Sequence, residues 1–280
     1  MSSRLRVYFQ LTKPTIILLV VITALATMMA EGSLYSAPMQ MILVLIAIVL
    51  SAGSANAFNQ FIDRDIDSVM ERTKNRRPLP LQQLTPQRAF LFAFLLGAIS
   101  NLYLLLKVNF LSAVISVATI LFYVFVYTVW LKRRHYYNIV IGGAAGATAP
   151  LIASAAATGR PSVLAWILFA IIFMWTPPHF WALALALQNQ YEKVKIPMLP
   201  NVLGEKRTRL EIILYTLTLL PLSLLPFWFA RATRGYLVFA VLIWIWYFYE
   251  TLARFSFPDQ SGIQKTFLHF DCLFVLTFSY

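Results

Sequence analysis

The sequence of 280 residues is poor in charge and nearly devoid of cysteine. Only 12% of its side chains are charged, whereas 60% are hydrophobic; a soluble globular domain carries about 25% charged residues. So few charges cannot cover a water-exposed body of 31.9 kDa, which excludes a soluble protein. The single cysteine, Cys272, excludes a disulfide scaffold and a multi-cysteine metal site. The dominance of apolar residues, without a three-residue or heptad repeat, excludes disorder, collagen and coiled coil. A membrane protein with several spans remains.

Long apolar runs predict an all-α polytopic membrane protein with about nine transmembrane helices in a single domain, residues 1–280. A spanning helix needs about 20 mainly apolar residues. The runs lie at 15–33, 38–60, 89–107, 110–131, 138–158, 163–187, 210–230, 235–253 and 265–280. The last run is short and carries Lys265, His269 and Asp271. Eight spans plus an interfacial helix is therefore an alternative.

The net charge of +12 is explained by membrane orientation. Loops on the cytoplasmic side of membrane proteins collect Lys and Arg. With the N-terminus inside, 19 of the 23 cations fall on the inner side and only Lys107, Arg160, Arg231 and Arg234 fall outside. Nucleic-acid binding is not needed to explain this basicity. Since neither a cleavable signal peptide nor a transit extension is evident, a bacterial-type plasma membrane with a cytoplasmic N-terminus is expected.

The acidic residues are scarce and clustered. Four of the eleven, Asp63, Asp65, Asp67 and Glu71, lie within nine residues at the inner end of the second span. Positions four apart share a helix face, so Asn59, Asp63 and Asp67 are predicted to form one stripe, while Asp65 points elsewhere. Oxygen ligands without histidine or cysteine suit Mg²⁺.

Cations follow these acids directly, and the combination predicts a diphosphate-binding site. Carboxylates can hold a metal while guanidinium groups bind anionic oxygens. The cations are Arg64, Arg72, Lys74, Arg76 and Arg77. The alternative is a positive-inside loop whose acids are merely solvated or paired. Acids at a membrane boundary are costly and usually functional, which favours the site.

A second polar focus lies at the inner end of the sixth span. It comprises residues 177–181, with two prolines and His179, and residues 188–193. The prolines are predicted to kink the helix and to free backbone carbonyls. His179 is either a hydrogen-bonded structural residue or a ligand. Because both foci follow inward-running spans, an internal repeat around a central cavity is expected.

These stretches resemble the UbiA superfamily of intramembrane prenyltransferases. Its first aspartate-rich motif, N-x-x-x-D-x-x-x-D, is matched by Asn59, Asp63 and Asp67. Longer strings are similar to the branch of that superfamily that farnesylates haem: LTKP (11–14), DRDIDSVMERTKNRRPLP (63–80), TPPHFWALAL (176–185) and IPMLP (196–200). Matching landmarks run in order from about residue 11 to residue 204.

The resemblance implies a UbiA-type bundle around a central cavity, with an active site that faces the cytoplasm. It implies transfer of a farnesyl group from farnesyl diphosphate to a vinyl group of haem B, which gives haem O for terminal oxidase biogenesis. Mg²⁺ is the implied cofactor and haem B a substrate. The lipid bilayer is the medium, and haem A synthase or a terminal oxidase are implied assembly partners.

The resemblance also implies roles for individual residues. Asn59, Asp63 and Asp67 would be catalytic and would hold the metal, and Tyr191 would be a further catalytic residue. The substrate-binding residues would be Arg64, Arg72, Lys74, Arg76, His179, Trp181, Glu192 and Lys193. An allylic cation would be shielded by aromatic faces, for which Phe58, Phe61, Phe180 and Trp181 are candidates.

Two positions depart from the family pattern. Gln190 stands where relatives place an acid before the tyrosine, which puts a second metal site in doubt. Arg76 and Arg77 stand where a single arginine is usual, so the guanidinium that meets the phosphate is open.

Competing functions are a UbiA-type enzyme with another aromatic or tetrapyrrole acceptor, and a secondary transporter. A structural role in oxidase assembly would leave the acids unexplained. Transporter sites lie near the bilayer midplane, whereas these acids lie at one membrane edge.

Overall fold

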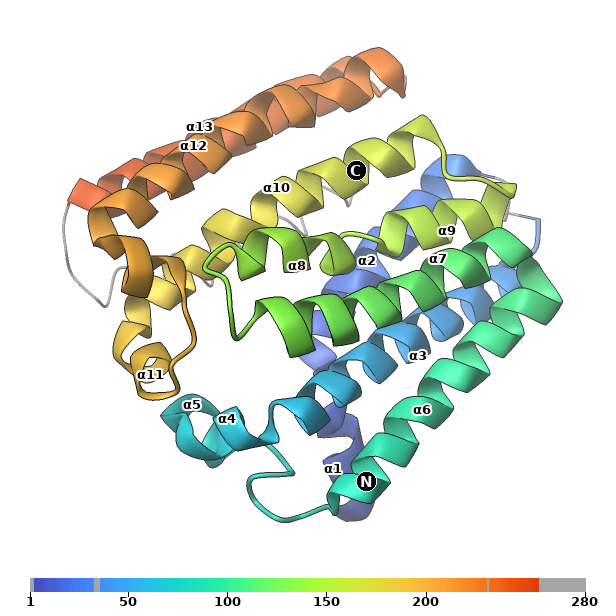
Figure 1. Ribbon diagram of the computed structural model, residues 1–280. Helices are drawn as coiled ribbons and strands as arrows, with labels where there is room; N and C mark the ends of the chain where they lie inside the picture. The colour runs from blue at the N-terminus through green and yellow to red at the C-terminus, as the bar shows by residue number, and fades with distance from the viewer. Residues whose placement is uncertain (1–2, 33–35, 231, 257–280) are drawn as a thin grey trace. The chain divides into compact units, whose positions relative to one another are not determined.

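The computed structural model describes residues 3–32, 36–230 and 232–256 (Figure 1). Every regular element in these residues is a helix, and eight helices are long and apolar enough to cross a membrane. They are Pro14–Glu31, Pro38–Ile62, Pro86–Val108, Phe110–Leu131, Asn138–Thr158, Val163–Ala186, Leu199–Phe229 and Arg234–Ala253. The prediction of an all-α, multi-pass protein is confirmed, and the proposed ninth span, 265–280, lies outside the described residues.

The chain divides into two compact units. The first unit comprises Met1–Arg133 and Thr148–Ser162, and the second comprises Arg134–Ala147 and Val163–Tyr280. The fifth span is shared between them, because its first half, α8, belongs to the second unit and its second half, α9, to the first.

The first unit contains the four clustered acids, Asp63, Asp65, Asp67 and Glu71, and most of the early helices. Its elements are α1 (Ser3–Leu11), α2 (Pro14–Glu31), α3 (Pro38–Ile62), α4 (Arg64–Val69), α5 (Glu71–Lys74), α6 (Pro86–Tyr103), η1 (Leu104–Val108), α7 (Phe110–Leu121), η2 (Phe122–Leu131) and α9 (Ala149–Thr158). Three of its spans begin with proline, whose fixed φ suits the first helical turn and whose missing N–H is not needed there.

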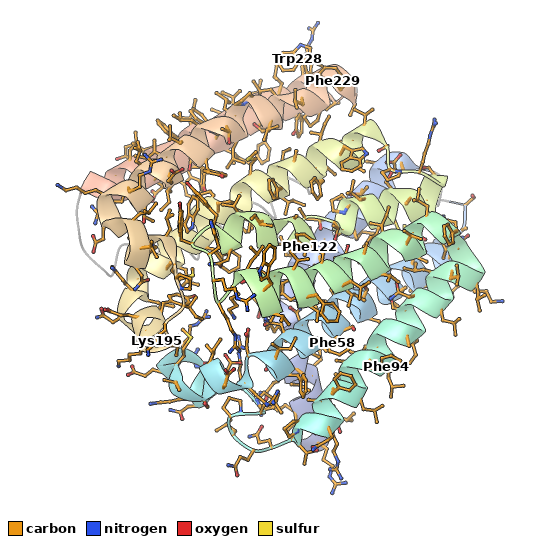
Figure 2. The ribbon with its side chains drawn as sticks, in the orientation of Figure 1. Phe58, Phe94, Phe122, Lys195, Trp228 and Phe229 are labelled. Atoms are coloured by element: carbon orange, nitrogen blue, oxygen red, sulfur yellow. The ribbon has the colours of Figure 1, made fainter. Side chains whose placement is uncertain are left out.

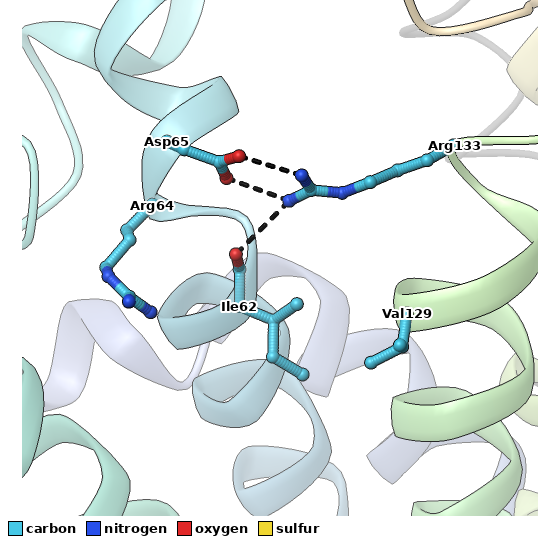
Figure 3. A pocket seen from close by; sticks show the side chains of 5 residues that line it. All are labelled: Ile62, Arg64, Asp65, Val129 and Arg133. Carbon is cyan, nitrogen blue, oxygen red and sulfur yellow. Dashed lines mark hydrogen bonds and ion pairs between the residues drawn. The ribbon is translucent and has the colours of Figure 1, made fainter.

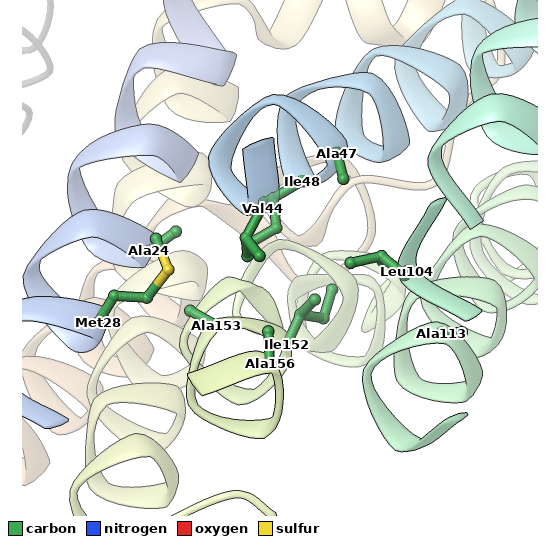
Figure 4. Packing of buried hydrophobic residues seen from close by; sticks show 10 residues of the cluster. All are labelled: Ala24, Met28, Val44, Ala47, Ile48, Leu104, Ala113, Ile152, Ala153 and Ala156. Carbon is green, nitrogen blue, oxygen red and sulfur yellow. The ribbon is translucent and has the colours of Figure 1, made fainter. Parts of the chain in front are cut away.

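Small side chains let the helices of the first unit approach closely around α3. The core of this unit joins α2, α3, η1, α7 and α9 (Figure 4). Five of its ten buried members are alanine, which suits helix contacts inside a membrane. Buried hydroxyls also link α3 to its neighbours. The hydroxyls of Ser51 on α3 and Ser116 on α7 lie 2.8 Å apart, and the hydroxyl of Ser100 on α6 donates to the Ala47 carbonyl over 2.6 Å.

Two segments of the first unit are π-helical. They are the five residues of η1 and the ten residues of η2. π-helical segments are rare, are mostly single turns, and often occur at functional sites. The ten-residue π-helix at the end of the fourth span therefore makes η2 a candidate functional segment.

The second unit contains α8 (Asn138–Gly146), α10 (Val163–Ala186), α11 (Gln188–Lys193), α12 (Leu199–Phe229) and α13 (Arg234–Ser256). Its buried cluster is built around Trp181 and Leu199. α10 stays helical through Pro177 and Pro178 and ends at Ala186. Figure 2 shows Trp228 and Phe229 projecting outward at the end of α12, as expected for apolar side chains at a span terminus.

Candidate active site

Asn59, Asp63 and Asp67 lie on one face, across the end of the second span. α3 ends at Ile62, and Asp63 joins it to the short helix α4. The helical spacing continues through this junction, because the Asp67 N–H donates to the Asp63 carbonyl over 2.9 Å. The Asn59 amide donates to Asp63 Oδ2 over 2.8 Å. All three side chains are buried, and we call them the acid stripe.

Each member of the acid stripe is already engaged by a cation from the same unit. Lys132 pairs with Asp63 Oδ2, and Arg77 pairs with Asp67 Oδ2. The Lys13 ammonium donates to Asn59 Oδ1 over 2.6 Å. Arg133 Nη2 lies 3.9 Å from Asp63 Oδ1. We call Lys13, Arg77, Lys132 and Arg133 the cation cluster.

Three separate structural features bring these cations to the stripe. Lys132 and Arg133 follow directly after η2. Arg77 returns through a folded loop, because the Thr73 hydroxyl donates to the Asp67 carbonyl over 2.9 Å and the Arg77 N–H donates to the Thr73 carbonyl over 2.9 Å. Lys13 lies in the turn between α1 and α2.

The η2 helix also contacts the stripe through a hydroxyl. Thr128 is fully buried, and its hydroxyl accepts from the Asn59 amide over 3.2 Å while it donates to the Tyr123 carbonyl five residues earlier over 2.8 Å. The donation over five residues follows the π-helical spacing. The amide of Asn59 is thereby oriented from two sides, with its oxygen toward Lys13.

Burial shifts the pKa of one carboxyl of the acid stripe and of one member of the cation cluster. Burial raises the pKa of the Asp67 carboxyl, although the Arg77 guanidinium opposes the shift. Burial lowers the pKa of Lys13 well below its usual range, and the nearby charges of Arg77 and Lys132 lower it further. Charged groups in such a water-poor site interact strongly with any ion that binds beside them.

In the described residues, one fully buried carboxylate oxygen of the acid stripe lacks a hydrogen bond. Asp63 Oδ1 is buried and accepts none from the described residues. The described part of the chain contains no group of three or more His, Cys, Asp or Glu that could hold a metal. Two carboxylates and an amide oxygen nevertheless fit Mg²⁺, which takes one or two carboxylates and fills its other positions with water and substrate phosphates.

Asp65 points away from the acid stripe, as its helical position predicts. Arg133 donates to both of its carboxylate oxygens, over 2.7 and 2.8 Å, and to the Ile62 carbonyl over 3.3 Å (Figure 3). These hydrogen bonds lower the pKa of the Asp65 carboxyl. Ile62, Arg64, Asp65, Val129 and Arg133 line an open pocket of about 400 Å³. Arg133 thus joins this pocket to the acid stripe.

The acid stripe is engaged by other cations than the four that were predicted to bind substrate. Arg64 is exposed, donates to the Phe61 carbonyl over 2.7 Å and lies 4.7 Å above the Phe61 ring. Arg72 and Lys74 are exposed on α5, and Arg76 is exposed in the turn that follows it. Arg77, the second of the two adjacent arginines, is the one that contacts Asp67.

The aromatic candidates of the first unit pack on a neighbouring helix. Phe58 and Phe61 each meet the ring of Phe90 on α6 edge to face, with centroids 5.5 Å apart. Tyr123 and Tyr127 stack on one another along η2, with centroids 5.2 Å apart.

The second unit contains the remaining predicted residues. His179 is buried in α10 and stacks on Trp175 with ring centroids 4.4 Å apart. Trp181 is fully buried and meets Tyr215 edge to face. Tyr191 is buried in α11, whereas Glu192 and Lys193 are exposed. The turn after α11 contains Lys195 in a left-handed conformation with φ 54° (Figure 2).

The sequence prediction missed three of the four members of the cation cluster, Lys13, Lys132 and Arg133. Lys132 and Arg133 are assigned there to membrane orientation alone, Lys13 only to orientation and to the LTKP landmark, and Arg77 is not distinguished from Arg76. The available signal was their position at the ends of apolar runs. That signal does not say which cations turn inward.

Comparison with known proteins identifies the family. The UbiA prenyltransferase family matches residues 20–277. The chain belongs to the UbiA prenyltransferase family. Among its curated relatives, protoheme IX farnesyltransferase of Symbiobacterium thermophilum is 50% identical over 85% of this chain and 79% of the relative. The enzyme of the same name from Gloeobacter violaceus is 46% identical over 98% and 92% of the two chains.

Solved structures show that the UbiA fold extends over nearly the whole chain. A UbiA homolog from Aeropyrum pernix K1 superposes with a TM-score of 0.76 at 15% identity and covers 95% of both chains. A UbiA homolog from Archaeoglobus fulgidus bound to DMAPP and Mg²⁺ superposes with a TM-score of 0.70 at 14% identity and covers 98% of this chain and 99% of its own. At these identities, the likeness concerns the fold.

Proposed function

We propose that this UbiA-family enzyme transfers the farnesyl group of farnesyl diphosphate to a vinyl group of haem B and so produces haem O for terminal oxidases. The names of its relatives support the acceptor and the donor. The observation that carries the proposal is the burial of two carboxylates beside four cations at the end of a membrane span. Such a site suits a diphosphate held by metal and protein charges.

The cation cluster would bind the diphosphate, and the acid stripe would hold Mg²⁺ through Asp63, Asp67 and Asn59. The Archaeoglobus fulgidus homolog binds an allylic diphosphate together with Mg²⁺, which supports the same pairing here. Bound Mg²⁺ would supply positive charge against the oxygens of the leaving group. Arg72, Lys74, Arg76 and Arg64 would attract the diphosphate from the surrounding loop and pocket.

The reaction needs charge stabilisation more than proton transfer. The C–O bond of farnesyl diphosphate breaks, and its electron pair leaves with the diphosphate. The haem vinyl group then forms a C–C bond to the allylic carbon, and water adds to the resulting porphyrin-side cation with loss of a proton. Lys132, Arg77 and Lys13, fixed in advance in a water-poor site, would stabilise the developing diphosphate charge without reorganisation.

The second unit would bind the acceptor. Tyr191, Glu192 and Lys193 on α11, with His179 and Trp181 on α10, are proposed for this role on the basis of their family motifs. His179 would either face the haem iron or order the helix through its contact with Trp175.

The site loops are proposed to face the cytoplasm of a bacterial-type cell. The excess of cations in the inner segments supports this orientation. We also propose that residues 1–280 act as one integral-membrane domain, with haem A synthase or a terminal oxidase as assembly partners.

The test is purified protein incubated with farnesyl diphosphate, Mg²⁺ and either haem B or an aromatic acid, followed by mass spectrometry. Farnesylated and hydrated haem is the expected product. Prenylation of the aromatic acid without any haem product would contradict the proposed acceptor while leaving prenyl transfer intact.

A further inference from the structure

Lys13 has a backbone conformation that normally favours glycine. α1 ends at Leu11, α2 begins at Pro14, and Lys13 between them has φ 56° and ψ 69°. Side chains with a Cβ rarely adopt this left-handed region, and glycine is usual where a helix ends in it. A turn that served folding alone would therefore be better made with glycine.

Two buried amides on α3 hold this turn in place. The Gln60 side chain donates to the Gln10 and Leu11 carbonyls, each over 3.0 Å, and the Asn56 side chain donates to the Thr12 carbonyl over 2.9 Å. These carbonyls lie at the C-terminal end of α1, where the helix itself supplies no N–H partners. α3 thus caps α1 with side chains.

Asn56 and Gln60, which hold the turn, lie close to Asn59, which accepts a hydrogen bond from Lys13. Asn56, Asn59 and Gln60 are spaced three and four residues apart on α3 and so share one face. The Asn59 side-chain oxygen accepts a hydrogen bond from the Lys13 ammonium over 2.6 Å. One helix face therefore both fixes the backbone of the turn and receives its side chain.

We propose that Asn56 and Gln60 are positioning residues for the diphosphate site, which hold Lys13 in its left-handed conformation so that its ammonium reaches the acid stripe. This inference rests on the proposed function. The conformation of Lys13 places its ammonium among Arg77 and Lys132, where like charges disfavour it. Such strain persists at functional sites when the surrounding structure imposes it.

The first test uses Lys13→Gly in the full-length protein. Thermal unfolding and the binding of inorganic pyrophosphate with Mg²⁺ are measured, the latter by calorimetry. We expect an unchanged or higher melting temperature, because glycine relieves the strain, together with pyrophosphate binding weakened about tenfold or more. A lower melting temperature with wild-type binding would overturn the proposal.

The second test is a double-mutant cycle with Lys13→Met. Asn56→Leu and Gln60→Leu should each weaken pyrophosphate binding about fivefold to tenfold, and should add little further loss in the Lys13→Met background. Asn101→Leu is the matched control, since the Asn101 amide also donates to a backbone carbonyl, that of Gly97, over 2.8 Å. Full additivity with Lys13→Met, or an equal effect of the control, would contradict a positioning role.

A third arm separates this inference from the proposed function. If Asp63→Asn binds Mg²⁺ and pyrophosphate as tightly as the wild type, the diphosphate site itself is wrong, and the positioning proposal falls with it. If Asp63→Asn loses binding while the Asn56 and Gln60 variants keep it, only the positioning proposal is overturned. Should one leucine variant fail to fold, the other leucine variant and its cycle with Lys13→Met decide the question, since both amides hold the same turn.

Discussion

At the scale of single residues, the buried carboxylate pair determines the chemistry of the first unit. Asp63 and Asp67 are almost fully buried, and each is paired with a cation. Removing one partner of such a pair leaves a buried charge unpaired, which costs more than the pair itself contributes. Of the two adjacent arginines, Arg77 contacts Asp67 whereas Arg76 is exposed, so Arg77 is the one expected to matter for the diphosphate site.

Arg77→Gln should weaken the site far more than Arg76→Gln. The first change removes a charge-assisted hydrogen bond to Asp67, worth about 2 kcal/mol, whereas Arg76 is exposed on the loop. We expect a loss in pyrophosphate affinity and in turnover of about tenfold or more for Arg77→Gln and a clearly smaller one for Arg76→Gln. Equal losses of pyrophosphate affinity and of turnover in the two variants would show that contact with Asp67 does not determine which arginine binds the phosphate.

At the scale of elements, η2 is the end of the fourth span that contacts the acid stripe. The π-helical spacing directs the Thr128 hydroxyl to the Tyr123 carbonyl and leaves it to accept from Asn59. The end of the same segment brings Lys132 to Asp63. Hydropathy does not distinguish a π-helix from an α-helix, so this feature was not predictable.

Thr128→Val should loosen Asn59 without changing the volume of the side chain. We expect pyrophosphate binding with Mg²⁺ to weaken about fivefold, which corresponds to the loss of about 1 kcal/mol in hydrogen bonding. Thr119→Val is the control, because the Thr119 hydroxyl on the preceding α7 donates only to the Ile115 carbonyl over 2.8 Å. Identical pyrophosphate affinities for the two variants would show that η2 does not contribute to the site through Thr128.

Helix contact in the second unit gives a prediction for stability. A Cβ at Gly143 on α8 would lie 2.9 Å from Thr176 Cγ2 on α10, whereas a Cβ at Gly146 would meet nothing within 4 Å. Gly143→Ala should therefore destabilise the protein by about 1–3 kcal/mol, seen as a lower melting temperature. Gly146→Ala should melt near the wild type, and the reverse order would contradict the packing of α8 on α10.

At the scale of the whole molecule, hydropathy predicted the spans, and helical spacing predicted part of the site. Eight predicted spans match helices, because burial in lipid forces a single helical solution on long apolar runs. The alignment of Asn59 with Asp63 followed from helical spacing. The break at Asp63, the return of Arg77 and the inward turn of Lys13 depend on tertiary contacts, which spacing along one helix does not contain.

The most direct test of the central claim compares wild-type protein with Asp63→Asn under identical conditions. Each purified protein is given haem B, farnesyl diphosphate and Mg²⁺, and the farnesylated haem is quantified by mass spectrometry after equal membrane insertion has been verified. The account predicts product from the wild type and none above background from Asp63→Asn. Undiminished product from Asp63→Asn would contradict the assignment of the acid stripe as the diphosphate site.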